Sequence, residues 1–326
     1  MTLPQPADAS RRYTYLTAED LTKRYFNAPS LKKDTLVWVL TSQGRKKKRK
    51  KKQGGACGGD KSQDDDQDDD EGSSSAIRTE LFLRARVVSE STRDDAGGDE
   101  PRVLVRYPKG STYHVRKSFL LPVLEPGAVT SDRIVLVVPE TPEYRRASVV
   151  HTTVGESFLE IGCDYGMCVD RVRKALSEVG AVPLVATNTG GDEEGSDSAC
   201  NDGNSSSQVA CLGVDKSPES IEIAAERYPE TTFSIEDALS DEGTAKMRAL
   251  CKQKLVGGHP NVVAIDINGN RLLDHVVECV KRVMNPGDDV AIGRDWDLPR
   301  LIIVKSRFLH EEVKRQQRHA RALEKC

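Results

Sequence analysis

The 326-residue sequence lacks several patterns that would assign it at once to a broad class of proteins. It has no apolar run of the length that a membrane span requires, and its first residues, MTLPQPADASRRY, contain no apolar stretch typical of a secretory signal. None of its eight cysteines forms a C-x-x-C pair, so no zinc site is expected. Cys211 and Cys279 lie in apolar stretches, where a reduced cysteine acts as a small hydrophobe. These features predict a soluble, intracellular protein without a metal centre and without contact with a membrane.

Two nucleotide-binding patterns are also missing. The sequence contains no phosphate-binding P-loop, which argues against nucleoside triphosphate hydrolysis. Residues 162–167, GCDYGM, do not supply the G-x-G-x-x-G pattern of dinucleotide-binding proteins. A hydride transfer that depends on a nicotinamide cofactor is therefore not expected.

The formal net charge is only −3, because blocks of basic and acidic residues cancel one another. Residues 45–52 are all basic, and residues 60–71 are almost all acidic or polar. The surrounding segment 41–76 has too little apolar content to order itself, and 89–101 and 187–207 are predicted to be further insertions. The basic run predicts nuclear targeting or binding to polyanions, and its alternative is a solvated run that balances the aspartates at 64–70. The nucleus and the cytoplasm are therefore both retained as locations.

The first 138 residues predict a small β-rich domain. Residues 1–12 are expected to be disordered, and a helix should begin at Thr17 and continue through Phe26. Residues 1–40 then contribute the first strand, residues 77–138 the rest, and the spacing of the strands predicts a barrel-like sheet. A binding role would use Arg106, Lys109, His114, Arg116 and Lys117, whereas a solvated sheet face is the favoured alternative. The predicted strands are 36–40, 80–88, 103–107, 112–116, 119–124 and 134–138.

Residues 139–326 alternate between apolar strands and helix patterns. This alternation predicts an α/β domain, a Rossmann-like parallel sheet with helices on both faces. Ser217 should cap one of the helices, with Pro218 in its first turn. The predicted strands are 158–162, 209–215, 232–235, 261–265 and 301–304, and the predicted helices are 143–151, 166–179, 272–284, 309–326 and one after Lys216.

The stretch from Phe158 to Val169, FLEIGCDYGMCV, is the centre of this domain. An apolar strand ends at Gly162, a turn follows, and a helix pattern begins at Gly166. Gly162 allows a sharp turn and a close approach to a ligand because it has no Cβ. Ligands of parallel sheets bind at the carboxyl ends of the strands, and these ends carry Glu160, Asp215, Asp237 and Asp266.

This pattern resembles the class I S-adenosylmethionine-dependent methyltransferases, whose first motif reads acidic-x-Gly-x-Gly-x-Gly. The resemblance covers residues 155–308 and implies that S-adenosylmethionine lies over Gly162. It further implies that Asp215 binds the ribose hydroxyls, Asp237 the adenine amino group, and Asp266 the methionine part and the acceptor. The cofactor-binding residues implied in this way are Glu160, Gly162, Asp164, Gly166, Asp215, Lys216, Asp237 and Asp266.

The sequence departs from the family pattern in two places. Asp164 replaces the middle glycine, and the two strands that most members add after the fifth are missing before Cys326. Either the sheet is short on that edge, or the N-terminal domain covers it. Because the missing part often helps to build the acceptor site, the resemblance does not identify the substrate.

Asp266 and Lys305 follow the fourth and fifth strands and are the candidate catalytic residues. An Asp and a Lys occupy similar strand ends in fibrillarin-like RNA ribose 2′-O-methyltransferases, so RNA is the favoured acceptor. In the favoured alternative, Lys305 only pairs with Asp266. A further alternative for the whole chain is a non-catalytic methyltransferase-like protein that binds nucleic acid or protein partners.

Overall fold

The computed structural model of the protein describes residues 3–7, 11–21, 33–39, 84–90, 102–107, 110–124, 126, 133–178, 208–267, 273–285 and 297–323. The predictions for the insertions 41–76 and 187–207, for the basic run 45–52 and for Lys109 lie outside the described residues. The chain divides into two compact units. Unit 1 comprises Met1–Asp20 and Glu125–Cys326, and unit 2 comprises Leu21–Leu124.

Unit 1 is built on a seven-stranded sheet in the order β1-β7-β12-β11-β8-β9-β10, and all of its strand pairs are parallel. From β8 onward, the chain builds outward to β9 and β10, then returns to place β11 on the other side of β8, followed by β12. This reversal of direction is the switch point of doubly wound sheets. The strands are β1 (Tyr13–Thr17), β7 (Arg133–Val138), β8 (Phe158–Ile161), β9 (Cys211–Asp215), β10 (Thr232–Ile235), β11 (Val262–Ile265) and β12 (Leu301–Lys305).

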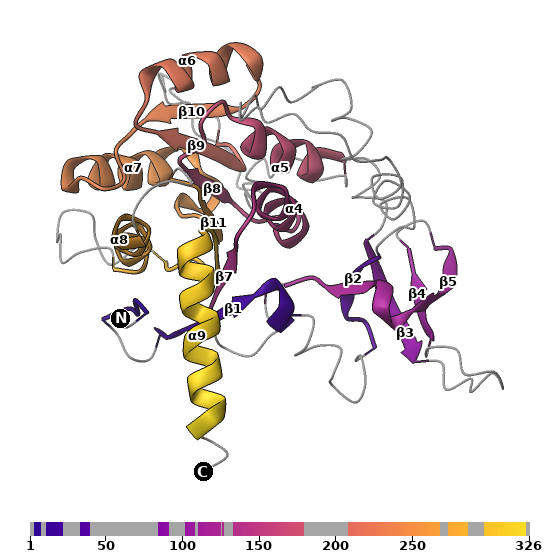
Figure 1. The fold of residues 1–326 in the computed structure, drawn as a ribbon. Coiled ribbons are helices and arrows are strands. Elements are labelled where there is room, and N and C mark those ends of the chain that lie inside the picture. The colour runs from indigo at the N-terminus through magenta and orange to yellow at the C-terminus, as the bar shows by residue number, and fades with distance from the viewer. Residues whose placement is uncertain are drawn as a thin grey trace, which may run out of the picture. The chain divides into compact units, whose positions relative to one another are not determined.

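Helices cover both faces of this sheet, with α4 and α5 on one side and α7, α8 and α9 on the other (Figure 1). The parallel sheet and its helices are consistent with the predicted Rossmann-like fold. None of the helices in the described part of the chain is long and apolar enough to cross a membrane. The helices are α4 (Thr141–His151), α5 (Met167–Glu178), α6 (Pro218–Arg227), α7 (Asp241–Lys254), α8 (Leu273–Met284) and α9 (Arg307–Leu323).

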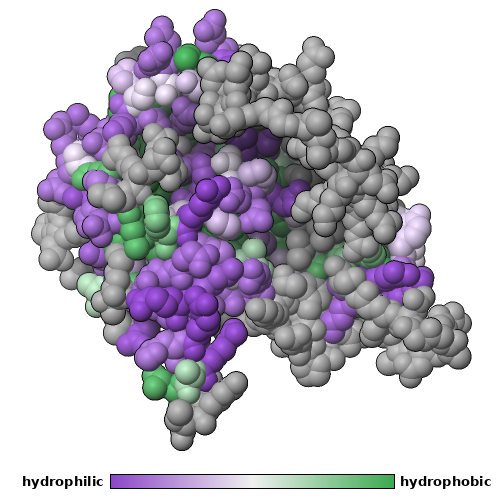
Figure 2. Space-filling view, viewed as in Figure 1, coloured by the Kyte–Doolittle hydropathy of each residue, from purple (hydrophilic) through white to green (hydrophobic). Residues whose placement is uncertain are grey.

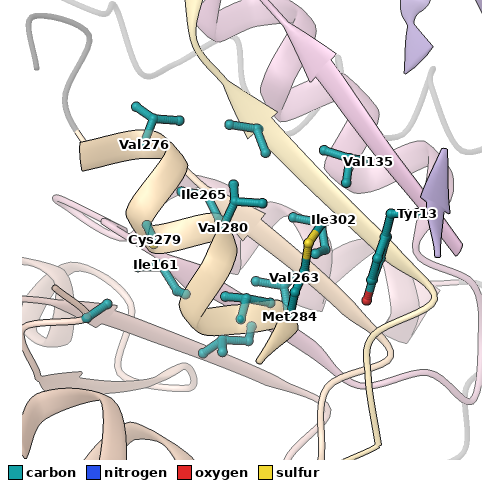
Figure 3. Close-up of a cluster of buried hydrophobic side chains, with 14 of the residues drawn as sticks. Tyr13, Val135, Ile161, Val263, Ile265, Val276, Cys279, Val280, Met284 and Ile302 are labelled. Carbon is teal, nitrogen blue, oxygen red and sulfur yellow. The ribbon is translucent and has the colours of Figure 1, made fainter. Parts of the chain in front are cut away.

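Alternation along the strands divides the core into two layers. In β8, Leu159 and Ile161 join the cluster beneath α7, α8 and α9, so Phe158 and Glu160 face α4 and α5. Figure 3 shows Val276, Val280 and Met284 of α8 against the strands of the sheet. Each of these side chains is at most 4% exposed, which is the burial expected of an amphipathic helix on a buried sheet.

The last two strands at one end of the parallel sheet, β1 and β7, come from the N-terminal part of the chain, which corrects the sequence prediction. Residues 134–138 were assigned to the β-rich domain, but β7 pairs with β12 and with β1 instead. Residues 1–12 were predicted to be disordered, yet Gln5 exchanges two hydrogen bonds of 2.9 Å with the backbone of Tyr13. The sheet therefore continues beyond β12, the fifth predicted strand, with β7 and β1, which come earlier in the chain. Both of these strands are parallel to their neighbours.

The C-terminal helix α9 is buried only near its start. Leu309, His310 and Val313 are buried, whereas the residues from Arg318 to Leu323 are exposed. The helix extends past the sheet in Figure 1, and Figure 2 shows a hydrophilic surface along it. Lys314 and Arg315 of this helix pair with Glu19 and Glu312.

Unit 2 is a five-stranded antiparallel sheet in the order β5-β4-β3-β2-β6. Its core contains small apolar side chains such as Val37, Val87 and Val105, each fully buried. Among the described residues, β5 and β6 are the two edges and do not pair, so the predicted barrel is not shown. The strands are β2 (Leu36–Val39), β3 (Arg84–Glu90), β4 (Arg102–Arg106), β5 (Thr112–Arg116) and β6 (Leu120–Pro122).

Candidate functional site

An open cleft of about 420 Å³ lies at the carboxyl ends of β8, β9, β10 and β11, beside the switch point of the sheet. Small-molecule sites are often found at this place in doubly wound sheets. The cleft therefore has the position of a cofactor site. It is lined by Ile161, Gly162, Asp215, Lys216, Glu236, Asp237, Ala238, Leu239, Asp266 and Ile267.

Gly162 stands at the bottom of the cleft because no other residue fits there. Its φ is 78°, and a Cβ would lie 2.1 Å from the backbone oxygen of Asp266. The amide of Gly162 donates to the oxygen of Val214 at 2.8 Å, and the amide of Asp266 donates to that of Ile161 at 2.9 Å. The ends of β8, β9 and β11 are thus drawn together at one point, with backbone facing the cleft.

Asp164 lies between Gly162 and Gly166 in the turn and has a positive φ, as they do. Its φ is 48°, a left-handed conformation that Asp tolerates better than most residues. Gly162 and Gly166 have positive φ as well, so the turn keeps a glycine-like backbone at all three positions. Asp164 therefore has the left-handed backbone that glycine adopts readily.

Asp164 and Asp215 form a connected pair at the mouth of the cleft. One oxygen of Asp215 accepts from the amide of Asp164 at 3.0 Å, and the other accepts from the amide of Ser217 at 2.9 Å. An ionised carboxylate has about four acceptor positions, so each oxygen keeps one for a ligand hydroxyl. Ser217 caps α6 as predicted, since its side chain accepts from the amide of Ser220. The turn and the cap together fix the direction of the Asp215 carboxylate.

Carboxylates dominate the lining of the cleft. Asp215, Glu236, Asp237 and Asp266 contribute four carboxyl groups, and Lys216 contributes one ammonium group. Such a lining disfavours phosphate groups and suits a ligand that carries positive charge and N–H or O–H donors. Asp237 also accepts from the amide of Leu239 at 3.0 Å, which holds the loop after β10 in place.

Asp266 and Lys305 meet across the adjacent ends of β11 and β12. The ammonium of Lys305 lies 3.0 Å from Oδ2 of Asp266, and the two side chains are 19% and 18% exposed. Burial raises the pKa of Asp266, and the charge of Lys305 opposes this rise. The residues predicted to be catalytic thus form one ion pair beside the cleft, and Asp266 alone of the two is part of its lining.

Glu160 lies outside the cleft, in contrast to its predicted position. Its side chain is 2% exposed, and Oε1 accepts from the hydroxyl of Tyr144 on α4 at 2.9 Å. Burial, reinforced by the nearby charge of Asp266, raises the pKa of Glu160 to about 8, so the group is mostly protonated at neutral pH. The alternation of β8 sends Ile161 toward one face of the sheet and Glu160 toward the other, away from any ligand in the cleft.

The structure therefore brings together five of the eight residues that the resemblance implied. Gly162, Asp215, Lys216, Asp237 and Asp266 line the cleft, whereas Glu160, Asp164 and Gly166 do not. A Cβ at Gly166 would lie 2.5 Å from the ring of Phe233, so Gly166 serves the packing of the turn against β10. Sequence reasoning missed Glu236 and Leu239 as lining residues, although the position of Glu236 directly after a predicted strand was a usable signal.

No family model, no curated protein and no solved structure matches this chain.

Proposed function

We propose that the cleft binds S-adenosylmethionine and that the protein is a methyltransferase. The observation that carries this proposal is the lining of the cleft: four carboxylates and one lysine around the open backbone at Gly162. The cofactor has a sulfonium and an ammonium cation, two ribose hydroxyls and an adenine amino group, and it has no phosphate. Carboxylates at the ends of β9, β10 and β11 match this set of donors and charges.

Calorimetry on the full chain tests cofactor binding. S-adenosylmethionine and S-adenosylhomocysteine should bind, and nicotinamide dinucleotides and nucleoside triphosphates should not, because their phosphates meet carboxylates. Asp215→Ala removes two charge-assisted bonds to the ribose and should cost about 2–4 kcal/mol of binding free energy. Glu222→Gln, an exposed change of the same charge on α6, is the matched control. Failure of the wild-type protein to bind either ligand at millimolar concentration would refute the assignment.

Methyl transfer to a hydroxyl, with RNA as the favoured acceptor, gives the Asp266–Lys305 pair a catalytic role. The reaction is an in-line displacement in which the hydroxyl must lose its proton, and a basic group beside the acceptor can take it. In the alternative, the ion pair only holds the ends of β11 and β12 together. The two roles differ in their consequence for turnover.

Single-turnover transfer of labelled methyl groups to total cellular RNA separates these roles. If the pair acts as one unit, Lys305→Ala reduces the rate strongly with little change in cofactor affinity, and adding Asp266→Ala costs little more. A wild-type rate in Lys305→Ala would leave only the structural role. Label on protein but not on RNA would exclude RNA as the acceptor. Stoichiometric cofactor binding without transfer to any extract would favour the non-catalytic alternative.

A further inference from the structure

Glu160 is a buried acid that does not line the cleft but lies close to one of the residues that do. Its register partners in the sheet are Ala264 on β11 and Gly213 on β9, which leave space above the strand for its carboxyl group. Because side chains alternate along a strand, Asp266, two residues beyond Ala264, continues the face that Glu160 occupies. The charge of Asp266 accordingly acts on both Glu160 and Tyr144. Asp266 therefore belongs to the cleft and also influences Glu160 behind it.

Titratable and charged groups face the Glu160 carboxyl group from each helix and strand end packed against it. Burial raises the pKa of Glu160, the hydrogen bond from Tyr144 lowers it, and the charge of Asp266 raises it. Because these contributions oppose one another, a charge added beside Asp266 shifts the balance. The groups concerned are Tyr144 and Arg145 of α4, Cys163 of the turn, Cys168 of α5, and Asp266 with its partner Lys305 of β12.

One oxygen of the Glu160 carboxyl group is unpaired within the described part of the chain. Oε1 accepts from the hydroxyl of Tyr144 at 2.9 Å, but Oε2 is buried and has no hydrogen-bond partner among the described residues. An unpaired buried polar atom is costly, and an ionised carboxylate in the same place costs more. Glutamine could accept the same bond from Tyr144 without the cost of ionisation, so stability does not explain an acid here. A buried polar group that lowers stability is typical of a functional site.

A cation that binds beside Asp266 changes the charge balance around Glu160. S-adenosylmethionine carries a sulfonium, whereas S-adenosylhomocysteine has a neutral thioether in its place. Because a nearby positive charge favours the ionised form of a carboxyl group, the sulfonium should favour loss of the Glu160 proton. We propose that Glu160 is a positioning residue, acting through Asp266, that releases its proton when S-adenosylmethionine binds and takes one up when the sulfonium becomes a thioether. This inference rests on the proposed function of the cleft.

Methyl transfer then leaves the net charge of the site unchanged. The bond between sulfur and the methyl carbon breaks, its electron pair stays on sulfur, and the acceptor hydroxyl forms the new bond and loses one proton. A sulfonium with an ionised Glu160 has the same net charge as a thioether with a protonated Glu160, so the site takes up one proton as the acceptor loses one. A buried site that keeps its net charge avoids the cost of an uncompensated charge.

Calorimetry of the full chain in Pipes, Hepes and Tris buffers measures proton release on binding. The slope of the observed enthalpy against the ionisation enthalpy of the buffer gives the number of protons exchanged. At pH about 7.5, S-adenosylmethionine should release about 0.3–0.7 proton more from the wild type than from Glu160→Gln, because most of the free protein holds the proton. S-adenosylhomocysteine should show no such difference. Comparison of the two proteins with one ligand cancels any proton exchanged by the amino group of the ligand.

The pH dependence of affinity is a second readout with a defined sign. Binding that releases a proton becomes stronger as the pH rises, until the free protein has lost that proton as well. The preference of the wild type for S-adenosylmethionine over S-adenosylhomocysteine, relative to that of Glu160→Gln, should therefore rise with pH. It should level off above the pKa of about 8 that Glu160 has in the free protein. Each unit by which the sulfonium lowers the pKa of Glu160 should increase this preference about tenfold.

Tyr144→Phe is the second variant, and Glu143→Gln is the matched control on the same helix. Loss of the bond from Tyr144 removes a contribution that lowers the pKa of Glu160, so proton release should decrease at pH about 7.5 and move to higher pH. Glu143→Gln removes an exposed carboxyl group, and its proton count should equal that of the wild type. Circular dichroism checks that each variant is folded.

Two results would overturn the inference and leave the cofactor assignment intact. The first is equal proton release by the wild type and Glu160→Gln on binding of S-adenosylmethionine, which would assign any release to another group, such as Lys305. The second is an equal difference between these proteins for both ligands, because Glu160 would then respond to occupation of the cleft and not to the sulfonium charge. Absence of binding by both ligands refutes the proposed function itself, and the inference with it.

Discussion

Glu160 shows that a residue can lie outside a functional site even though its position in the sequence predicts that it belongs to that site. It precedes the glycine turn, but its side chain is buried between the sheet and α4 and bonds to Tyr144. A carboxyl group held there is costly to ionise, since burial is the main cause of its raised pKa. Glu160 therefore acts as a neutral hydrogen-bonding group behind the turn.

Replacement of Glu160 by glutamine should stabilise the protein in a pH-dependent way. Below pH about 4.5, both the folded and the unfolded chain hold the proton, so Glu160→Gln changes little. As the pH rises towards 8, the unfolded carboxyl ionises while the folded one with a pKa of about 8 does not, which lowers wild-type stability. The advantage of the variant should approach about 4 kcal/mol at pH 8. Urea unfolding at pH 4 and pH 8 measures it, and an equal advantage at both values would contradict the raised pKa.

A comparison of Gly162 with Gly155 separates two effects of replacing a glycine: the strain of a positive φ, and the clash of a new Cβ with neighbouring backbone. Both have positive φ, 78° and 86°, but a Cβ at Gly155 has nothing within 4 Å, whereas one at Gly162 meets the backbone of Asp266. Gly155→Ala should cost about 1–2 kcal/mol, the penalty of a left-handed alanine. Gly162→Ala should cost clearly more and abolish cofactor binding. Unfolding and calorimetry on both variants check this, and equal losses would show that the contact with Asp266 does not matter.

At the scale of elements, β1 is the strand that sequence reasoning missed. Within the described part of the chain it pairs only with β7, and its two tyrosines anchor it through their hydroxyl groups. Tyr13 donates to the oxygen of Pro299 at 2.6 Å, and Tyr15 donates to that of Pro4 at 2.7 Å. Burial raises the pKa of both hydroxyls, so they remain donors throughout the physiological range. The bond from Tyr13 ties the edge of the sheet to the segment that leads into β12.

Tyr13→Phe should lower the free energy of unfolding by about 1–3 kcal/mol, because it leaves the buried oxygen of Pro299 without this donor. Tyr165→Phe is a suitable control, since Tyr165 is 45% exposed and a surface change of this kind usually stays within about 0.5 kcal/mol. Chemical denaturation of both variants measures the difference. A loss in Tyr165→Phe as large as that in Tyr13→Phe would mean that the hydroxyl of Tyr13 contributes nothing specific.

At the scale of the whole molecule, unit 2 is an insertion between two strands of unit 1. The chain leaves the parallel sheet after β1, forms the antiparallel sheet, and returns to the parallel sheet at β7. Each unit has its own buried cluster of apolar side chains. Inserted domains with separate cores can often be removed without loss of the host fold.

Replacement of Leu21–Leu124 by a Gly/Ser linker of about ten residues should leave unit 1 folded. The shortened protein should melt cooperatively and bind S-adenosylmethionine with unchanged affinity, because every residue that lines the cleft belongs to unit 1. Calorimetry and circular dichroism test this. Loss of cofactor binding in a folded variant would show that unit 2 contributes to the cleft.

The sequence by itself determined the alternation of strands and helices from Thr141 to Leu323, the glycine turn at Gly162, and the acids at the strand ends. These features are local, because periodicity and turn chemistry depend on neighbouring residues. Only the tertiary structure decided that β1 and β7 complete the parallel sheet, since pairing joins segments far apart in the chain. It also decided which face of β8 Glu160 occupies and that Arg102 lies opposite Arg116. Burial and register arise when strands meet, and no local pattern specifies which strands will meet.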